Sequence, residues 1–143
     1  MSVKAFIDTN IFIYAQRTDN LVKKQVAEKA INFFDCVAST QVLNEIANVF
    51  TKKYPAPVKK VEFLLKSICE ISSIIVINET LITHALFLHD RYKLSYYDCL
   101  IIAAALSAKC ESLISEDIQD GMLIEGSLKI VNIFNHTDLF AFT

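Results

Sequence analysis

Short apolar runs alternate with longer stretches of helical periodicity along most of the chain. The runs are rich in apolar and β-branched residues, which is typical of strands, and they span residues 3–7, 36–38, 73–77, 112–115 and 128–134. The first run is apolar almost throughout, as expected for a central strand of a parallel sheet. The pattern therefore predicts about five strands.

The stretches between these runs place apolar residues three and four positions apart, which is the spacing of one helix face. They predict a short helical turn at residues 10–14 and helices at about residues 20–34, 40–54, 57–70, 78–91 and 95–108. Residues suited to N-capping precede most of these helices: Asp19 or Asn20, Ser39 or Thr40, Asn78 and Ser95. Strands that alternate with helices predict an α/β protein with a parallel sheet covered on both faces.

The chain of 143 residues is long enough for one domain with a sizeable core, and no linker or repeat divides it. Hydrophobic residues make up 53% of the chain, which excludes a disordered protein. No apolar run reaches the roughly 20 residues of a membrane-crossing helix, and no secretory signal is recognisable. We therefore expect a single domain over residues 1–143 in the cytoplasm, with the scattered cysteines reduced and in the core.

The net charge of −2 provides no overall attraction for nucleic acid. It does not exclude an enzyme that acts on RNA, because metal ions and a local basic patch can supply the positive field. Glycine occurs only at Gly121 and Gly126, so the chain has no glycine-rich phosphate-binding loop. The acidic residues are the stronger candidates for chemistry.

The first predicted strand stops at Asp8, and Thr9 and Asn10 follow it directly. In an open parallel sheet, ligands bind just beyond the carboxyl ends of the strands, so Asp8 lies where a functional site is expected. The alternative is that Asp8 or Thr9 only caps the helical turn that follows. The choice between these interpretations depends on whether other acids reach the same edge.

Three further acids occupy special positions. Asp117 lies just beyond the fourth predicted strand, and Asp98 lies in the first turn of an apolar helix, where the helix dipole favours negative charge. Glu45 lies beside Val49 at the edge of an apolar helix stripe. Each acid also has a purely structural interpretation, as a loop acid, a capping residue or a boundary residue. The convergence of four separate elements favours a shared site with Asp8.

Carboxylates that lie side by side raise one another's pKa unless a cation is present. The sequence places no Lys, Arg or His to pair with these acids, so a bound cation is expected. Oxygen ligands of this kind suit Mg²⁺ or Mn²⁺, and such ions activate water and stabilise charge on a phosphate. The acids therefore predict a site for Mg²⁺ or Mn²⁺, with Asp8, Thr9 and Asn10 at its floor.

The segments that carry these acids resemble those of PIN-domain ribonucleases, and in particular VapC-type toxins of bacterial toxin–antitoxin pairs. The matching segments are FIDTNI at residues 6–11, VLNE at 42–45, YYDCLIIAAA at 96–105 and LISED at 113–117. Each motif alone is only a single acid in an apolar setting. The four occur in the family's order over essentially the whole chain, and this order makes the resemblance fairly specific.

The resemblance implies a three-layer α/β/α fold and an endoribonuclease that cleaves single-stranded RNA with Mg²⁺ or Mn²⁺. It assigns the catalytic quartet to Asp8, Glu45, Asp98 and Asp117. Asp8, Asp98 and Asp117 are expected to hold the metal, while Glu45 either binds it or orients the nucleophile. The supporting residues would be Thr9, Asn10 and Ser115, with Asp120 as a further acid in the outer shell or at a second metal. The resemblance also implies a homodimer and a cognate antitoxin.

Contacts with RNA are assigned to the densest basic positions near these segments. They are Lys52 and Lys53, at the end of the helix that carries Glu45, and Arg91 and Lys93, which precede Asp98. Tyr92, Tyr96 and Tyr97 could stack on an unpaired base. The alternatives are a solvated turn for the lysines, and core or dimer contacts for the tyrosines.

Two other functions are compatible with parts of the pattern. One is a catalytically silent PIN-like module that only binds RNA or protein, and the intact acidic quartet argues against it. The other is a Mg²⁺-dependent phosphatase of the haloacid-dehalogenase type, whose first strand also ends in Asp. That class has a second Asp two residues later, where this chain has Asn10.

Overall fold

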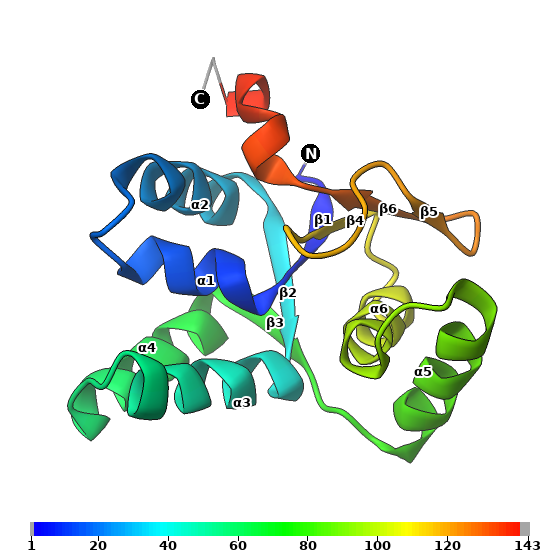
Figure 1. The fold of residues 1–143 in the computed structure, drawn as a ribbon, viewed down its shortest axis with the longest axis horizontal. Helices are drawn as coiled ribbons and strands as arrows, with labels where there is room; N and C mark the ends of the chain where they lie inside the picture. Colours follow the sequence, from blue (N-terminus) through cyan, green and yellow to red (C-terminus); the bar gives the residue numbers. More distant parts are fainter. Residues whose placement is uncertain (1, 141–143) are drawn as a thin grey trace.

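The computed structural model describes residues 2–140 and contains helices on both sides of one sheet (Figure 1). The strands are β1 (Lys4–Ile7), β2 (Asp35–Ser39), β3 (Ser72–Ile75), β4 (Ser112–Ile114), β5 (Leu123–Ile124) and β6 (Leu128–Val131). The α-helices are α1 (Thr9–Gln16), α2 (Leu21–Phe33), α3 (Thr40–Asn48), α4 (Val58–Ile71), α5 (Glu79–Tyr92) and α6 (Tyr96–Ser107). The predicted strands and helices are confirmed, with shifts at several of their ends.

The sheet has the strand order β3-β2-β1-β4-β6-β5, so β1 lies at its centre beside β2 and β4. Five strands are parallel, and β5 pairs antiparallel with β6. The sequence pattern missed β5 because a two-residue strand has no detectable alternation. Its turn into β6 places Glu125 and Gly126 at positive φ values of 51° and 70°. Gly126 adopts this conformation without the strain that a side chain would add.

The helices form the two outer layers of the predicted α/β/α fold. Figure 1 shows α1, α2, α3 and α4 on one face of the sheet and α5 and α6 on the other. None of the helices within residues 2–140 is long and apolar enough to cross a membrane. The carboxyl ends of β1 and β4 lie side by side in this sheet, and the acidic segments 8–10 and 115–117 follow them directly.

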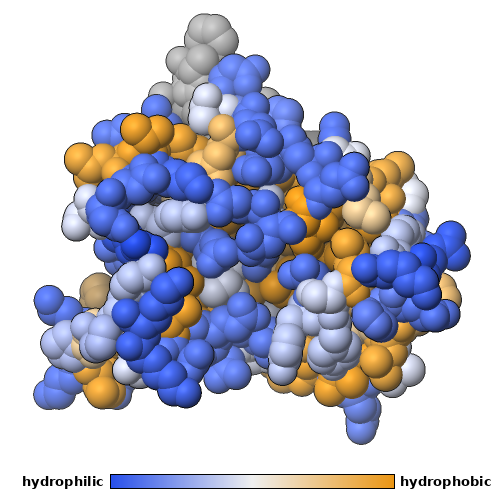
Figure 2. Space-filling model, in the orientation of Figure 1, coloured by the Kyte–Doolittle hydropathy of each residue, from blue (hydrophilic) through white to orange (hydrophobic). Residues whose placement is uncertain are grey.

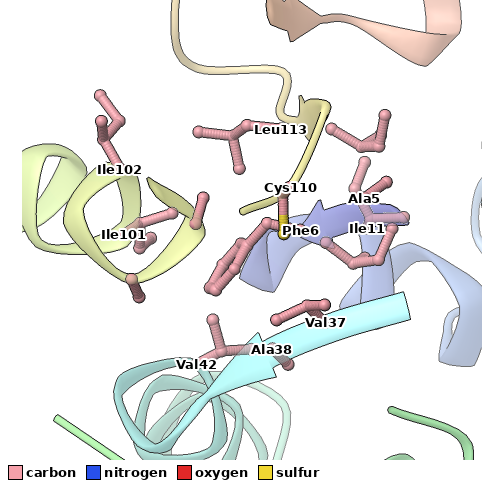
Figure 3. Close-up of a cluster of buried hydrophobic side chains, with 14 of the residues drawn as sticks. Ala5, Phe6, Ile11, Val37, Ala38, Val42, Ile101, Ile102, Cys110 and Leu113 are labelled. Atoms are coloured by element: carbon pink, nitrogen blue, oxygen red, sulfur yellow. The ribbon is translucent and has the colours of Figure 1, made fainter. Parts of the chain in front are cut away.

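Apolar side chains fill the space between the central strands and α6. Figure 3 shows Phe6 and Leu113 pointing toward Ile101 and Ile102 of α6, while Ala5 lies on the opposite side of β1. All five side chains are at most 3% exposed. Helix α6 is buried along most of its length because it is apolar on nearly every face. This packing fixes the start of α6 against the sheet.

Some predictions about local structure were wrong. The last predicted strand was extended to residue 134, but β6 ends at Val131, and a 3₁₀ helix follows at Ile133–Asn135. The Asn132 side chain accepts a hydrogen bond from the Phe134 backbone N–H and so turns the chain out of the sheet. Cysteines 36, 99 and 110 are buried as expected, but Cys69 is exposed on α4.

The predicted N-caps are confirmed at α2, α3, α5 and α6. The side chains of Asn20, Ser39, Asn78 and Ser95 each accept a hydrogen bond from a backbone N–H of the following first turn. Helix α3 continues into a π-helical turn at Val49–Lys53 instead of remaining α-helical to residue 54. The cap at Ser95 begins the helix that carries Asp98.

We expect Ser95→Ala to lower the free energy of unfolding by about 1 kcal/mol, because the Asp98 backbone N–H loses its acceptor at 3.2 Å. Urea unfolding followed by circular dichroism measures this difference. Ser95→Asn is the matched control, since Asn retains a capping oxygen and should stay near the wild-type value. Equal stability of the Ala and Asn variants would contradict a capping role for Ser95.

Candidate active site

Asp8 lies at the carboxyl end of β1 and is only 5% exposed. One carboxylate oxygen accepts a hydrogen bond from the Thr9 backbone N–H at 2.7 Å, and the other accepts one from Ser115 Oγ at 2.8 Å. Both bonds come from neutral donors. Asp8 is thus a buried acid without a cationic partner among residues 2–140.

Ser115 holds two segments of the site together from the end of β4. Its hydroxyl donates to Asp8 and accepts a hydrogen bond from the Asp117 backbone N–H at 3.2 Å. Its side chain is fully buried. The parallel pairing of β1 with β4 places Ile7 opposite Ile114, so the two strands end together. This register brings Ser115 beside Asp8.

Thr9 links the end of β1 to α3. Its hydroxyl donates to Glu45 Oε2 at 3.0 Å, and the Gln41 side-chain amide donates to Glu45 Oε1 at 3.0 Å. Both oxygens of this half-buried carboxylate are therefore fixed. Gln41 was missed in the sequence, although it lies four residues before Glu45 and so on the same helix face.

Asn10 links α1 to the loop after β4. Its side-chain amide donates to Asp117 Oδ2 at 2.9 Å. Asp98, in the first turn of α6, is close enough for its charge to raise the pKa of Asp117. The structure therefore brings all four predicted acids to one edge, with Glu45 and Asp117 held by the two residues that follow Asp8.

The electrostatics of this edge reflect burial and mutual repulsion. The pKa of Asp8 is raised to about 7, and burial is the largest cause of the increase. Hydrogen bonds from Ser115 and Thr9 oppose the increase, and the charges of Glu45 and Asp117 contribute to it. Burial is also the largest cause of the raised pKa of Asp117. A cation bound here would favour the ionised forms of both groups.

The donor set fits a divalent cation by its chemistry. It offers carboxylate oxygens on several elements, and no lysine, arginine or histidine in the described part of the chain balances the charge of Asp8. Among residues 2–140, however, no three acidic, histidine or cysteine side chains lie close enough together to enclose an ion. Mg²⁺ needs only one or two carboxylates and keeps several waters. The site therefore fits an ion that is bound partly through water.

The sequence pattern predicted that either Asp8 or Thr9 caps the helical turn after β1. Asp8 is the N-cap residue, and Thr9 is the first residue of α1. The Thr9 hydroxyl is used for Glu45 instead. Capping and placement at the sheet edge are combined in Asp8.

Asp120 lies apart from these contacts, beside the end of β6. Its carboxylate accepts a hydrogen bond from the Asn132 backbone N–H at 2.9 Å, and its other oxygen lies 2.8 Å from His136 Nε2. These interactions lower the pKa of Asp120. The structure does not connect it to Asp8 by a hydrogen bond, and a role at a metal stays a prediction.

The four predicted basic residues have different surroundings. Lys53 lies over the Tyr54 ring and lines a cavity of about 190 Å³ together with Asn10. Lys52 is exposed one residue earlier. Arg91 and Lys93, at the end of α5, pair with Glu125 and Asp90 at 3.4 and 3.5 Å. Only Lys53 is thus connected to the acidic edge through shared lining residues.

Other positive groups near the site were missed in the sequence. Arg17 lines the same cavity and lies over the Tyr54 ring, with its guanidinium 4.1 Å from the ring centroid. Lys23 pairs with Glu116, the neighbour of Asp117, and its charge partly offsets the increase in the pKa of Asp117. Neither Arg17 nor Lys23 belongs to a recognisable sequence motif. The packing of α1 and α2 brings both residues to the site.

The surface around these residues is mainly polar. Figure 2 shows hydrophilic side chains where α1, α3 and α6 approach one another, whereas hydrophobic side chains gather toward α5. A polar surface with an acidic floor and flanking cations can accept a charged, hydrated substrate. This arrangement suits a phosphodiester better than an apolar ligand.

The layered fold and the carboxylates at the ends of β1 and β4 define a class of α/β/α proteins whose candidate site is an acidic sheet edge. Within this class, the sequence profile of the PIN domain matches residues 5–119. The chain belongs to the PIN-domain family.

Solved structures of toxin–antitoxin proteins have similar folds. A toxin–antitoxin complex from Klebsiella pneumoniae matches with a TM-score of 0.66 and 23% identity, over 90% of this chain and 97% of that one. VapBC2 from Rickettsia felis, bound to a promoter DNA fragment, matches with a TM-score of 0.65 and 16% identity, over 90% and 98%. VapC20 from Mycobacterium tuberculosis, a toxin that cleaves the sarcin–ricin loop, gives 0.63 and 15%, over 79% and 91%. No curated protein sequence matches the chain.

Proposed function

We propose that this protein is a metal-dependent endoribonuclease that cleaves single-stranded regions of RNA. The observation that carries the proposal is Asp8, a buried carboxylate whose pKa is raised to about 7 and whose neighbours include further acids. Such perturbed groups are typical of functional sites. Membership of the PIN-domain family supports the same function.

Asp8, Asp98 and Asp117 would hold Mg²⁺ or Mn²⁺, directly or through water. When bound, such an ion lowers the pKa of a coordinated water and stabilises negative charge on the phosphate. Ser115 and the Thr9 backbone N–H fix the Asp8 carboxylate. Thr9 and Gln41 fix Glu45, which leaves its carboxylate placed to accept a proton from the attacking water.

The flanking cations would hold the RNA backbone. Arg17 and Lys53 line the cavity that reaches Asn10, and phosphate oxygens are suitable partners for both side chains. These residues join Lys52, Arg91 and Lys93 as proposed contacts. Because the chain has a net charge of −2, such a local patch must provide the attraction for RNA.

We also propose that the protein is the toxin of a toxin–antitoxin pair, acting in the cytoplasm and held inactive by a cognate antitoxin. The support is the similar fold of toxin–antitoxin complexes, which each cover nearly the whole chain. A homodimer is proposed as well. Helix α5 exposes Ile82, Leu86 and Phe87, an apolar surface of the kind that dimers bury.

We expect the purified protein to cleave single-stranded RNA with Mg²⁺ or Mn²⁺, to lose this activity in EDTA and to regain it when the ion is restored. Gel analysis of an end-labelled RNA measures the products. Asp98→Asn should cleave at least about 100-fold more slowly, because the developing charge loses stabilisation. Asp35→Asn, an exposed acid at the start of β2, is the matched control and should match the wild type.

Three results would overturn the proposal or part of it. Cleavage that continues in EDTA would exclude the metal dependence. RNA binding without products at any ion concentration would indicate a silent module. Hydrolysis of a small phosphate ester but not of RNA would indicate a phosphatase.

A further inference from the structure

A second pocket adjoins the candidate active site, between α3 and the first turn of α6. It has a volume of about 370 Å³, and Glu45 lies in its wall, so the pocket and the acidic edge share this residue. The other lining residues are Gln41, Asn44, Asn48 and Tyr97. The pocket is thus directly next to the acidic edge, with Glu45 between it and the other three acids.

The lining on α3 is arranged on one face of the helix. Gln41, Asn44, Glu45 and Asn48 are separated by three, one and three residues, the spacing that aligns side chains along a single helical stripe. Three of these four carry a carboxamide. None of the described residues that line the pocket is a lysine or arginine, so its chemistry does not suit a phosphate.

The carboxamides are available to a ligand. Within residues 2–140, the side chains of Asn44 and Asn48 have no hydrogen-bond partner, and both residues are exposed. The Gln41 amide nitrogen donates to Glu45, which leaves its oxygen as an acceptor. Each free carboxamide offers donors and an acceptor side by side, which is the complement of a nucleobase edge.

Tyr97 supplies an aromatic wall opposite α3. Tyr97 is 62% exposed, which is unusual for a residue with a large aromatic ring. The ring of Tyr96 packs edge-on against it, with centroids 5.5 Å apart. A supported and exposed ring can stack on a base of any identity.

We propose that this pocket binds one unpaired nucleobase of the substrate RNA, next to the phosphate that is cleaved. Tyr97 stacks on the base, and Asn44 and Asn48 bind its edge, so these residues select the nucleotide beside the cleavage site. The inference rests on the proposed ribonuclease activity and assigns its substrate contacts. Recognition of an unstacked base through its edge is the usual way in which proteins read RNA sequence.

The test is a scan of a short single-stranded RNA in which each nucleotide in turn is replaced by an abasic one. With the wild type, one position near the cleaved bond should lower kcat/KM by about 10-fold, in the range that loss of one stacked base produces. Tyr97→Ala should lower kcat/KM for the intact RNA by a similar factor. In this variant, the abasic substitution at the sensitive position should cause no further decrease. Tyr97→Phe should behave as the wild type, because it keeps the stacking face.

The control variant is Phe63→Ala, which removes another exposed ring, on α4, and should leave kcat/KM unchanged. Asn44→Ala and Asn48→Ala should reduce the discrimination among the four bases at the abasic-sensitive position. Additive effects of Tyr97→Ala and the abasic substitution would overturn the pocket assignment. So would a Tyr97→Ala enzyme that cleaves RNA normally but binds a partner protein more weakly.

Binding separates failure of this inference from failure of the proposed function. Fluorescence anisotropy with the Asp8→Asn variant, which is not expected to cut, measures affinity for the same RNA series. A loss at one abasic position, absent in the Asp8→Asn/Tyr97→Ala double variant, would support the pocket even if the wild type showed no cleavage. Equal affinity across the series would overturn it even if the wild type cleaved RNA.

Discussion

Asp8→Asn is expected to slow RNA cleavage at least about 100-fold while the protein stays folded. The substitution removes a negative charge from the acidic edge and changes the side-chain volume little. Its amide oxygen can accept the Thr9 N–H bond. The Ser115 hydroxyl, which now donates to Asp8 at 2.8 Å, can rotate to accept from the new amide group.

The experiment compares initial rates of cleavage at saturating Mg²⁺ for the wild type, Asp8→Asn and Asp35→Asn. Asp35 is an exposed acid at the opposite end of a neighbouring strand, so its variant should cleave as the wild type does. Circular dichroism confirms that each variant is folded. A rate for Asp8→Asn within a few-fold of the wild type would show that the chemistry lies elsewhere.

The second large effect is a pH dependence of stability in metal-free protein. The pKa of Asp8 is raised from 3.8 to about 7 in the folded state, so the folded protein holds a proton that the unfolded chain has already released. The free energy of unfolding should therefore fall as pH rises from about 4 to about 7. A full proton difference corresponds to about 1.4 kcal/mol per pH unit. Asp117, whose pKa is also raised, acts in the same direction.

Urea unfolding in EDTA at pH 5 and pH 8 isolates the contribution of Asp8. Asp8→Asn should be more stable than the wild type at pH 8, and this advantage should be much smaller at pH 5. Glu116 and Asp120, whose lowered pKa values act in the opposite direction, are common to both proteins and cancel in the comparison. Adding Mg²⁺ should reduce the difference, because an ion favours the charged carboxylate. A pH-independent difference would contradict the raised pKa.

The sheet and most helices were predictable because their signals are local. An apolar run such as residues 3–7 indicates a buried strand, and a capping residue such as Asn78 indicates where a helix begins. The predictions failed where a structure is too short to have a period, as in β5. They failed also where one side chain redirects the backbone, as Asn132 does after β6.

The acids of the candidate site were predictable because Asp8 and Asp117 follow strands, Asp98 lies in the first turn of a helix, and Glu45 lies at the edge of an apolar helix stripe. The hydrogen bonds that join these acids to their neighbours were not predictable. Whether Thr9 would cap α1 or bind Glu45 depends on the approach of α3, which the sequence does not specify. The same holds for Arg17 and Lys23, whose surroundings come from the packing of α1 and α2. Gln41 was within reach of a prediction through its spacing to Glu45.

The three consecutive residues after β1 make the site dependent on nearly the whole chain. Asp8 bonds to Ser115 and Asn10 bonds to Asp117, and each pair is separated by 107 positions in the sequence. A chain that is still being synthesised, or one cut before Ser115, has the first acid but lacks the residues that orient it and its later partners. The candidate site is therefore complete only when the segment from Ser115 to Asp117 has folded against the end of β1.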